Sequence, residues 1–161
     1  MKQYPILMRP ELVLATLEGR KTQTRRLNHR AEVGDVLWVK ETWCQSGQEC
    51  NKPYYLYRAD KAPAVAQSMK WKPSLFMPKV ACRLFLLVTA VRWEALQEIL
   101  CNDMLAEGCI PKGVTGGQWQ QWQRDYFMPL WDSINTKPGA TWRDNPQVKV
   151  ITFDPIEMEA K

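Results

Sequence analysis

The segment Arg83–Arg92 carries the strongest strand pattern in the chain, because leucine, phenylalanine and valine dominate it between two arginines. Val36–Val39 is a second apolar run, which follows a Gly-Asp turn, and Val148–Phe153 alternates as a closing strand would. Tyr54–Arg58 is a further strand candidate. These segments are spread over the whole chain, so the fold must contain a sheet that joins distant parts of the sequence.

Helical patterns separate these strands. Pro10 suits the first helical position and Gly19 suits the residue after the last, which predicts a helix between them. Trp93–Gly108 reads as a helix broken near its middle, and Gln118–Ile134 as an amphipathic helix kinked by its proline. Ser46–Lys52 is polar and reads as a loop. The order of elements predicts a small α+β domain, with a curled sheet and helices packed outside it.

Composition sets the class of protein. The chain has 161 residues, of which 45% are hydrophobic and 24% charged, as in one soluble globular domain. No apolar run approaches the ~18 residues that a membrane span needs, and the N-terminus lacks a signal-peptide pattern, so we expect a cytoplasmic protein. The five cysteines form no CxxC pair and His29 is the single histidine. We therefore expect no disulfide scaffold, no metal site and no cofactor.

Positive charge is concentrated near the N-terminus. The net charge is +5, and residues 1–30 alone carry seven basic and two acidic side chains, so that 7 − 2 = +5 lies in this segment. The excess is densest from Arg20 to Arg30. A local basic patch favours a phosphate-bearing ligand such as nucleic acid, although a solvated basic turn gives the same pattern.

The same segment holds groups that could perform chemistry. Lys21 can act as a base if burial or neighbouring cations lower its pKa, and Thr24 offers a hydroxyl nucleophile. An irregular turn is needed to bring them together, since they do not share a face of an ideal strand. Glu41, among aromatic residues, and Glu107, at the end of a predicted helix, are candidate acids. A plain basic turn with solvated hydroxyls is the alternative.

Tryptophan is unusually frequent, with eight in the chain. Trp43 and Trp71 lie near predicted loop ends and are candidates for stacking on a base. Trp119, Trp122 and Tyr126 have helical spacing and are expected in the core.

Four segments in order resemble the ASCH-domain proteins, in particular the longer version found in bacteriophages and prophages. They are Glu18–Arg26, Gly34–Trp43, Trp71–Pro78 and Leu130–Asn135. The resemblance runs from about residue 5 to 154. It implies a PUA-like fold, a curled β-barrel flanked by helices, which binds RNA or a modified nucleoside in a cleft beside the barrel. The chain would be one domain over residues 1–161, with insertions at about 45–78 and 111–145.

The resemblance also implies an activity. Small bacterial ASCH proteins similar to this chain hydrolyse N4-acetylcytidine, with a lysine and a threonine of a GxKxxT segment and a glutamate on a later helix. These fall on Lys21, Thr24 and Glu107. By analogy Thr24 attacks the acetyl carbonyl, Lys21 takes its proton and Glu107 protonates the leaving amine. The remaining candidate ligand contacts are Arg20, Arg25 and Arg26, which would hold phosphate, with Glu41, Trp43 and Trp71.

Two other functions stay open at this point. The chain could be a non-catalytic module of a phage that binds RNA or a host protein, because its insertions reshape the cleft. A ribonuclease is the third reading, although a metal-dependent nuclease would need an acidic cluster that the sequence does not display.

Overall fold

The computed structural model describes residues 1–49, 52–60, 69–111, 113–114 and 118–158. A five-stranded mixed sheet forms its centre. In order across the sheet, the strands are β1 (Gln3–Leu7), β3 (Val36–Lys40), β6 (Phe85–Ala95), β7 (Gln147–Ile156) and β2 (Gln23–Arg26). β1 and β3 are parallel, and every other neighbouring pair is antiparallel. The four strands expected from the sequence are present, and the α+β class is confirmed.

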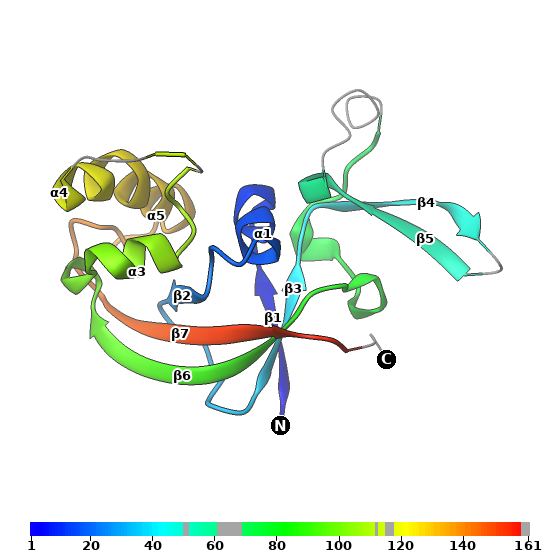
Figure 1. Ribbon diagram of the computed structural model, residues 1–161, viewed down its shortest axis with the longest axis horizontal. Helices are drawn as coiled ribbons and strands as arrows, with labels where there is room; N and C mark the ends of the chain where they lie inside the picture. Colours follow the sequence, from blue (N-terminus) through cyan, green and yellow to red (C-terminus); the bar gives the residue numbers. More distant parts are fainter. Residues whose placement is uncertain (50–51, 61–68, 112, 115–117, 159–161) are drawn as a thin grey trace.

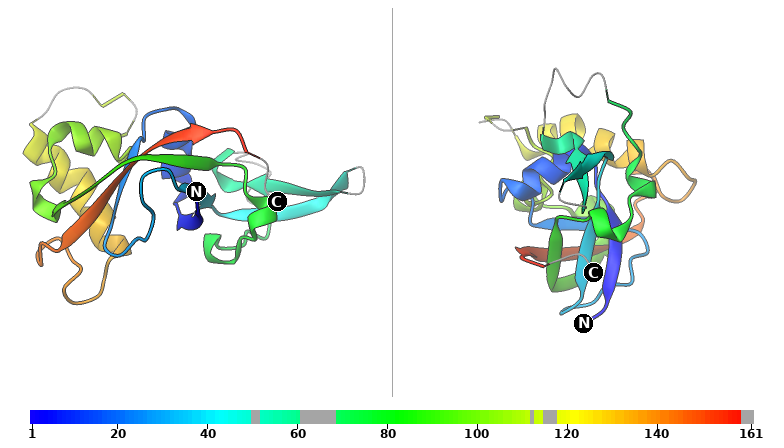
Figure 2. Two further views of the ribbon diagram at one scale, coloured as in Figure 1. Left: turned by 90° about the horizontal axis from the view of Figure 1, so that it is seen from below. Right: turned by 90° about the vertical axis from the view of Figure 1, so that its right-hand side faces the viewer.

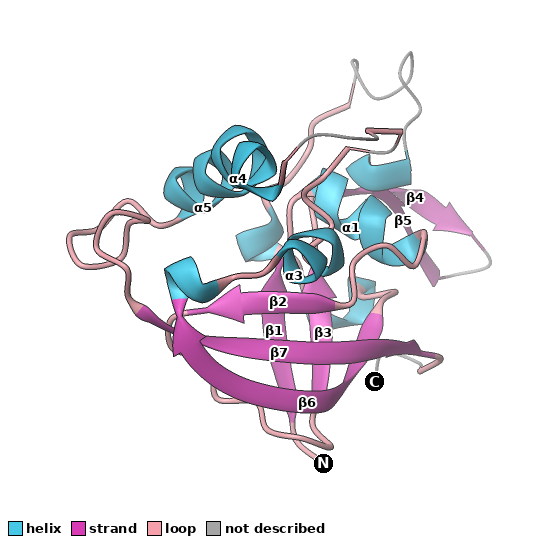
Figure 3. Ribbon diagram, turned by 60° about the vertical axis from the view of Figure 1, so that its left-hand side comes forward, coloured by secondary structure: helices cyan, strands magenta, loops and turns pink. Residues whose placement is uncertain are grey.

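The sheet curls without closing. β6 and β7 are long and bent, and a bulge between Val88 and Ala90 interrupts their pairing, as expected where a strand bends. Figure 3 shows β1 and β3 running across the direction of β7 and β2. Among the described strands, β1 and β2 pair on one side only, so both are edges of the sheet. The α+β fold that the resemblance implies is therefore present, but its curled sheet does not close into a barrel.

Helices gather on one side of the sheet (Figures 1 and 3). They are α1 (Pro10–Leu17), α3 (Cys101–Ala106), α4 (Trp119–Trp122), a π-helical turn (Gln123–Phe127) and α5 (Met128–Ile134). The last three form one continuous helical segment, as the sequence predicts, and the π turn comes just before Pro129. That proline has no N–H to donate, so a local change of helical pitch is expected there. No helix in the described ranges is both long and apolar enough to cross a membrane.

Two predicted boundaries are wrong. The helix expected from Trp93 begins only at Cys101, because the ladder between β6 and β7 continues as far as Ala95 opposite Gln147. The loop expected over Ser46–Lys52 is wrong where the structure describes it, because Ser46–Glu49 lie in β4 (Trp43–Glu49) and Lys52 begins its hairpin partner β5 (Lys52–Tyr57). The rest of that expected loop lies outside the described residues. This hairpin projects away from the helices (Figure 2). A two-stranded ribbon in solvent needs few apolar residues, which explains why its polar sequence reads as a loop.

Two apolar clusters fix the helices against the sheet. Val13 of α1 packs with Ile6, Leu37 and Phe153 of the sheet, all of them 2% exposed or less. A second cluster lies at the start of β7. It contains Met104 of α3 with Phe127 and Trp131 of the α4–α5 segment. The residues just before β2 lie between α1 and α3, because the N–H of Lys21 donates to Ala15 and that of Thr22 donates to Ala106. Within the basic segment this buries Lys21 and Arg25, whereas Arg30 is exposed.

Candidate functional site

Lys21 enters the interior because the end of α1 turns the chain sharply. Gly19 has a φ of +73°, a conformation that suits glycine after a helix, and the main-chain N–H groups of Arg20 and Lys21 both donate to the carbonyl of Ala15. The chain then runs directly into β2. The Lys21 side chain is 1% exposed as a result.

The ammonium of Lys21 joins the end of α1 to the end of α3. Its Nζ donates to the main-chain oxygens of Gln23 (2.7 Å) and Glu107 (2.9 Å), and to Oε2 of Glu107 (3.0 Å). Glu107 directly follows α3, where the helix dipole disfavours an acid, and the lysine charge offsets that cost. Burial lowers the pKa of Lys21, while the Glu107 carboxylate acts in the opposite direction.

Arg25 holds the other carboxylate oxygen of Glu107. Its Nη1 lies 2.9 Å from Oε1, and its guanidinium also pairs with Glu94 (2.5 Å) and Asp103 (3.1 Å). Arg92 completes the group by pairing with the same two acids. The network consists of Lys21, Arg25 and Arg92 with Glu94, Asp103 and Glu107, so its formal charges balance. The phosphate contact expected of Arg25 does not fit this burial, because the side chain is 1% exposed and paired with acids.

Thr24 lies beside this network with its hydroxyl unused. The residue is 1% exposed, and its Oγ1 has no hydrogen-bond partner among the described atoms. No hydrogen bond joins it to Lys21, whose Nζ donates to Gln23 and Glu107 instead. A buried hydroxyl without a partner is costly, and in native structures such groups often mark function.

Lys21, Thr24 and Glu107 line one small cavity of about 50 Å³. Arg25 and Arg26 contribute to the same wall. The opposite wall comes from α1 and from the α4–α5 segment, with Leu12, Phe127, Leu130, Trp131, Ile134 and Asn135. The cavity is therefore polar on the side of β2 and mostly apolar on the side of α5.

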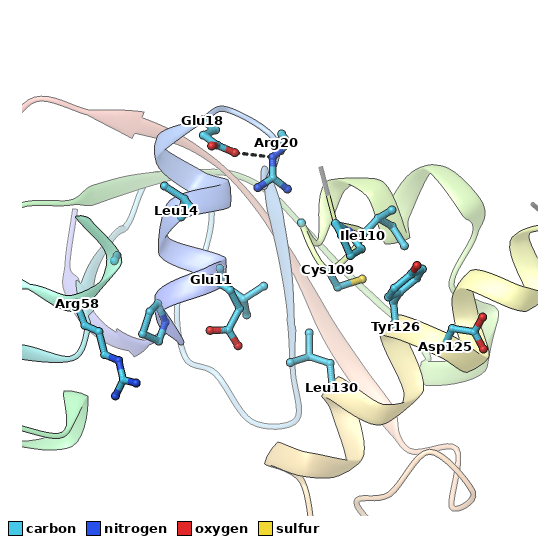
Figure 4. A pocket seen from close by; sticks show the side chains of 15 residues that line it. Glu11, Leu14, Glu18, Arg20, Arg58, Cys109, Ile110, Asp125, Tyr126 and Leu130 are labelled. Atoms are coloured by element: carbon cyan, nitrogen blue, oxygen red, sulfur yellow. Dashed lines mark hydrogen bonds and ion pairs between the residues drawn. The ribbon is translucent and has the colours of Figure 1, made fainter. Parts of the chain in front are cut away.

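A wider cleft of about 640 Å³ adjoins this cavity. Leu12 and Leu130 line both hollows, so the cavity and the cleft are neighbours. Figure 4 shows Leu130 and Tyr126 on one wall, with Glu11 and Arg58 on the other. The two neighbouring hollows together make up the candidate site, with the wide cleft as its outer part and the small cavity lined by Thr24 as its inner part.

The charges of the cleft do not form a basic surface. Three acids (Glu11, Glu18 and Asp125) and two arginines (Arg20 and Arg58) line it. Arg20 pairs with Glu18 at 2.7 Å, as the dashed line in Figure 4 marks. Cys109 also lines the cleft, and burial raises the pKa of its thiol to about 12. The lining thus carries one more acid than base, which does not favour a polyanion.

The other predicted ligand residues divide between the site and elsewhere. Arg26 lines the cavity and donates to the main-chain oxygens of Arg25 and Leu7. Glu41 is buried under Arg83 at 2.8 Å, and burial raises its pKa. Trp43 is 5% exposed and packs edge-on against Tyr55.

Neither Glu41 nor Trp43 lines the cavity or the cleft, and the half-buried Trp71 does not line them either. The structure therefore unites Lys21, Thr24, Glu107, Arg25 and Arg26, places Arg20 in the cleft, and leaves Glu41, Trp43 and Trp71 apart.

Sequence reasoning missed Glu94 and Asp103, two of the acids that hold Arg25, and the wall formed by α5. Glu94 lies in the end of β6 that the sequence predicts to be helix, which concealed that it faces Arg25 across the sheet. The signal for the wall was available, because Leu130–Asn135 is one of the four segments of the resemblance. In the described part of the chain, no group of three or more histidine, cysteine, aspartate or glutamate residues is arranged to hold a metal ion.

Comparisons with known proteins bear on the fold. No family model and no curated protein matches the sequence. Among solved structures, the ASCH domain from Lactobacillus crispatus aligns over 96% of this chain and 79% of its own, with a TM-score of 0.51 at 11% identity. A variant of the ASCH protein from Zymomonas mobilis aligns over 99% of this chain and 76% of its own, with a TM-score of 0.43 at 14% identity, which adds no weight. The chain therefore has the fold of an ASCH domain, as its sequence segments predict.

Proposed function

We propose that this protein hydrolyses an N4-acyl group from a modified cytidine, with Thr24 as nucleophile, Lys21 as base and Glu107 as acid. One observation carries the proposal. A buried hydroxyl without a partner lies in the same cavity as a buried lysine–glutamate pair. Acyl transfer needs these three groups together: an oxygen to attack the carbonyl, a base for its proton and an acid for the leaving nitrogen.

The direct contact between Lys21 and Glu107 supports the two proton roles. Movement of one proton along the 3.0 Å hydrogen bond converts ammonium and carboxylate into amine and carboxylic acid. Burial lowers the pKa of Lys21, which favours loss of its proton. Arg25 acts in the opposite sense, because it stabilises the carboxylate form of Glu107. The pair can therefore supply a base and an acid at once, without exchange of a proton with solvent.

The steps balance in atoms and charge. Thr24 Oγ1 bonds to the acyl carbon while its proton passes to the Lys21 amine. The carbon–nitrogen bond then breaks, and Glu107 gives its proton to the cytidine nitrogen. Water next attacks the Thr24 ester, losing a proton to Glu107, while Lys21 returns a proton to Oγ1 and the carboxylic acid leaves. The positive charge of Arg26 at the cavity wall would stabilise the oxyanion of both steps.

A free nucleoside suits the cleft better than an RNA strand. The charged residues that line it number three acids and two arginines, and one of these arginines is already paired with Glu18. A polynucleotide backbone selects clustered cations, which this lining does not provide. A neutral base and sugar need apolar surface with a few polar groups, as the wide cleft offers.

Incubation with N4-acetylcytidine tests the proposal. We expect release of cytidine and acetate in equal amounts, and chromatography measures both products. Lys21→Met should abolish release, while Lys2→Met, which changes an exposed lysine that lines neither hollow, should not. Absence of release by the wild-type protein would remove the proposed function.

A non-catalytic binding module is the second candidate, and one observation favours it. The Lys21 ammonium already donates to three oxygens, and Arg25 is paired with acids, so the network also stabilises the fold without any ligand. In that case RNA or a host protein would bind without turnover. RNA affinity that falls steeply with added salt, with no release of cytidine, would select this candidate.

A further inference from the structure

We infer that the inner cavity beside Thr24 is a size-limited pocket for the acyl group of the substrate, and that Leu130 and Ile134 of α5 set its upper limit. This inference rests on the proposed function and names the part of the substrate that the inner cavity takes. Its wall comes from the α4–α5 segment, which falls in the insertion predicted at about residues 111–145.

The two sides of the cavity match the two ends of an acyl group. A carbonyl needs polar partners, and the side of β2 supplies Lys21, Thr24 and Arg26. An alkyl tail needs apolar surface, and the side of α5 supplies Phe127 and Ile134. The hydroxyl without a partner lies on the polar side, where a carbonyl carbon would have to be placed for attack.

The volume of the cavity favours a short acyl group. At about 50 Å³ it exceeds by roughly three- to fivefold the ~10–15 Å³ that one water molecule requires. That space accepts an acetyl group, whereas a butanoyl chain or a benzoyl ring needs a wall to move. The base and sugar would remain in the outer cleft, beyond Leu12 and Leu130.

The wall has little freedom to yield. The indole Nε1 of Trp131 donates to the main-chain oxygen of Ala140 at 2.8 Å, and Phe127 stacks on the same ring at 6.3 Å between centroids. Trp142 packs edge-on against Phe127 at 5.9 Å. These contacts hold in place the wall that α5 contributes to the cavity.

Ile134 offers a clean way to enlarge the pocket. It lines the cavity but is 50% exposed, so its truncation should not unfold the protein. Leu17 of α1 is also 50% exposed and lines neither hollow, which makes Leu17→Ala the matched control.

The test compares N4-acetyl-, N4-butanoyl- and N4-benzoylcytidine as substrates. The wild-type protein should prefer the acetyl compound by about tenfold or more in kcat/KM, since extra methylenes in a closed pocket carry a penalty of that order. Ile134→Ala should reduce the preference over butanoyl about tenfold, and Leu17→Ala should leave it unchanged. Equal rates on all three compounds, or no change in Ile134→Ala, would overturn the inference.

A binding measurement separates this inference from the proposed function. Calorimetry with Thr24→Ala, which lacks the nucleophile, should show tighter binding of N4-acetylcytidine than of either cytidine or N4-butanoylcytidine. This pattern without turnover by the wild-type protein would retain the acyl pocket and remove the hydrolase. Equal affinity for cytidine and N4-acetylcytidine would remove the pocket, whatever the turnover.

Discussion

The Nζ of Lys21 and the Oε2 of Glu107 lie 3.0 Å apart in the protein interior, with side chains 1% and 8% exposed. The two residues are 86 positions apart in sequence, and their contact joins the end of α1 to the end of α3. This ion pair is central both to the stability of the site and to the chemistry proposed for it.

Removing the acid should damage the fold more than removing the base. Glu107→Leu leaves both Lys21 and Arg25 without this carboxylate, and loss of one partner of a buried pair typically costs about 3–5 kcal/mol. Lys21→Met should cost less, because Glu107 keeps Arg25. Urea unfolding of the two variants measures the difference. Equal losses would contradict the central place of Glu107 in the network.

The stability contributed by Lys21 should depend on pH. Burial lowers the pKa of Lys21 below its ordinary 10.5, so between the lowered value and 10.5 the folded protein binds fewer protons than the unfolded chain. The free energy of unfolding therefore rises with pH across that window. Urea unfolding at a series of pH values should show the free energy of unfolding of the wild-type protein rising, relative to that of Lys21→Met, as the pH rises. A constant difference would mean that the pKa of Lys21 is not lowered.

Gly108 should tolerate no side chain. Its φ is +69°, and an added Cβ would lie 2.7 Å from the Cβ of Lys21 and 2.9 Å from that of Ala15. Gly108→Ala should lose about 2–4 kcal/mol, from left-handed strain and overpacking together. Gly34→Ala is the control, since Gly34 has a φ of +87° and an added Cβ there would meet nothing within 4 Å. This variant should lose only about 1 kcal/mol of stability. Similar losses in the two variants would show that the contact with Lys21 is not tight.

The thiol of Cys109 should be unreactive although it lines the cleft. Its pKa is raised from an ordinary 9.0 to about 12, so alkylation by iodoacetamide at neutral pH should be about a thousandfold slower than for a free cysteine. Peptide mapping by mass spectrometry, before and after unfolding in urea, gives the two rates. Rapid labelling in the folded state would mean that the Cys109 thiol is more exposed to solvent, or surrounded by more positive charge, than in this structure.

The sequence predicts part of the central sheet. Its strand patterns identify β3, β6 and β7, and β5 of the hairpin, because burial in a sheet is read directly from residue type, but they do not identify the edge strands β1 and β2. The burial of Arg25 could not be predicted, because nothing in the local sequence distinguishes it from the adjacent Arg26. The position of the Arg25 side chain depends on its ion pairs with Glu94 and Asp103, which lie far along the chain. The helix predicted from Trp93 begins only at Cys101, because the ladder extends β6 to Ala95 and pairing with β7 overrides local helix preference there.

The convergence of Lys21, Thr24 and Glu107 was expected from a resemblance and not from spacing. On an ideal strand Lys21 and Thr24 point apart, and the sharp exit from α1 at Gly19 brings both to one cavity. Glu41 illustrates the opposite outcome. It was a candidate acid because of its aromatic surroundings, and the structure pairs it with Arg83, away from the cavity.

The rate of cytidine release by Thr24→Ala, compared with Thr22→Ala, tests the central claim most directly. Thr22 precedes β2 by one residue, carries the same hydroxyl and does not line the cavity, so its removal should leave the rate close to that of the wild-type protein. Thr24→Ala should lose at least about a thousandfold, as expected when a nucleophile is removed. Release of cytidine by Thr24→Ala at the wild-type rate would contradict the assignment of this buried hydroxyl as the attacking group.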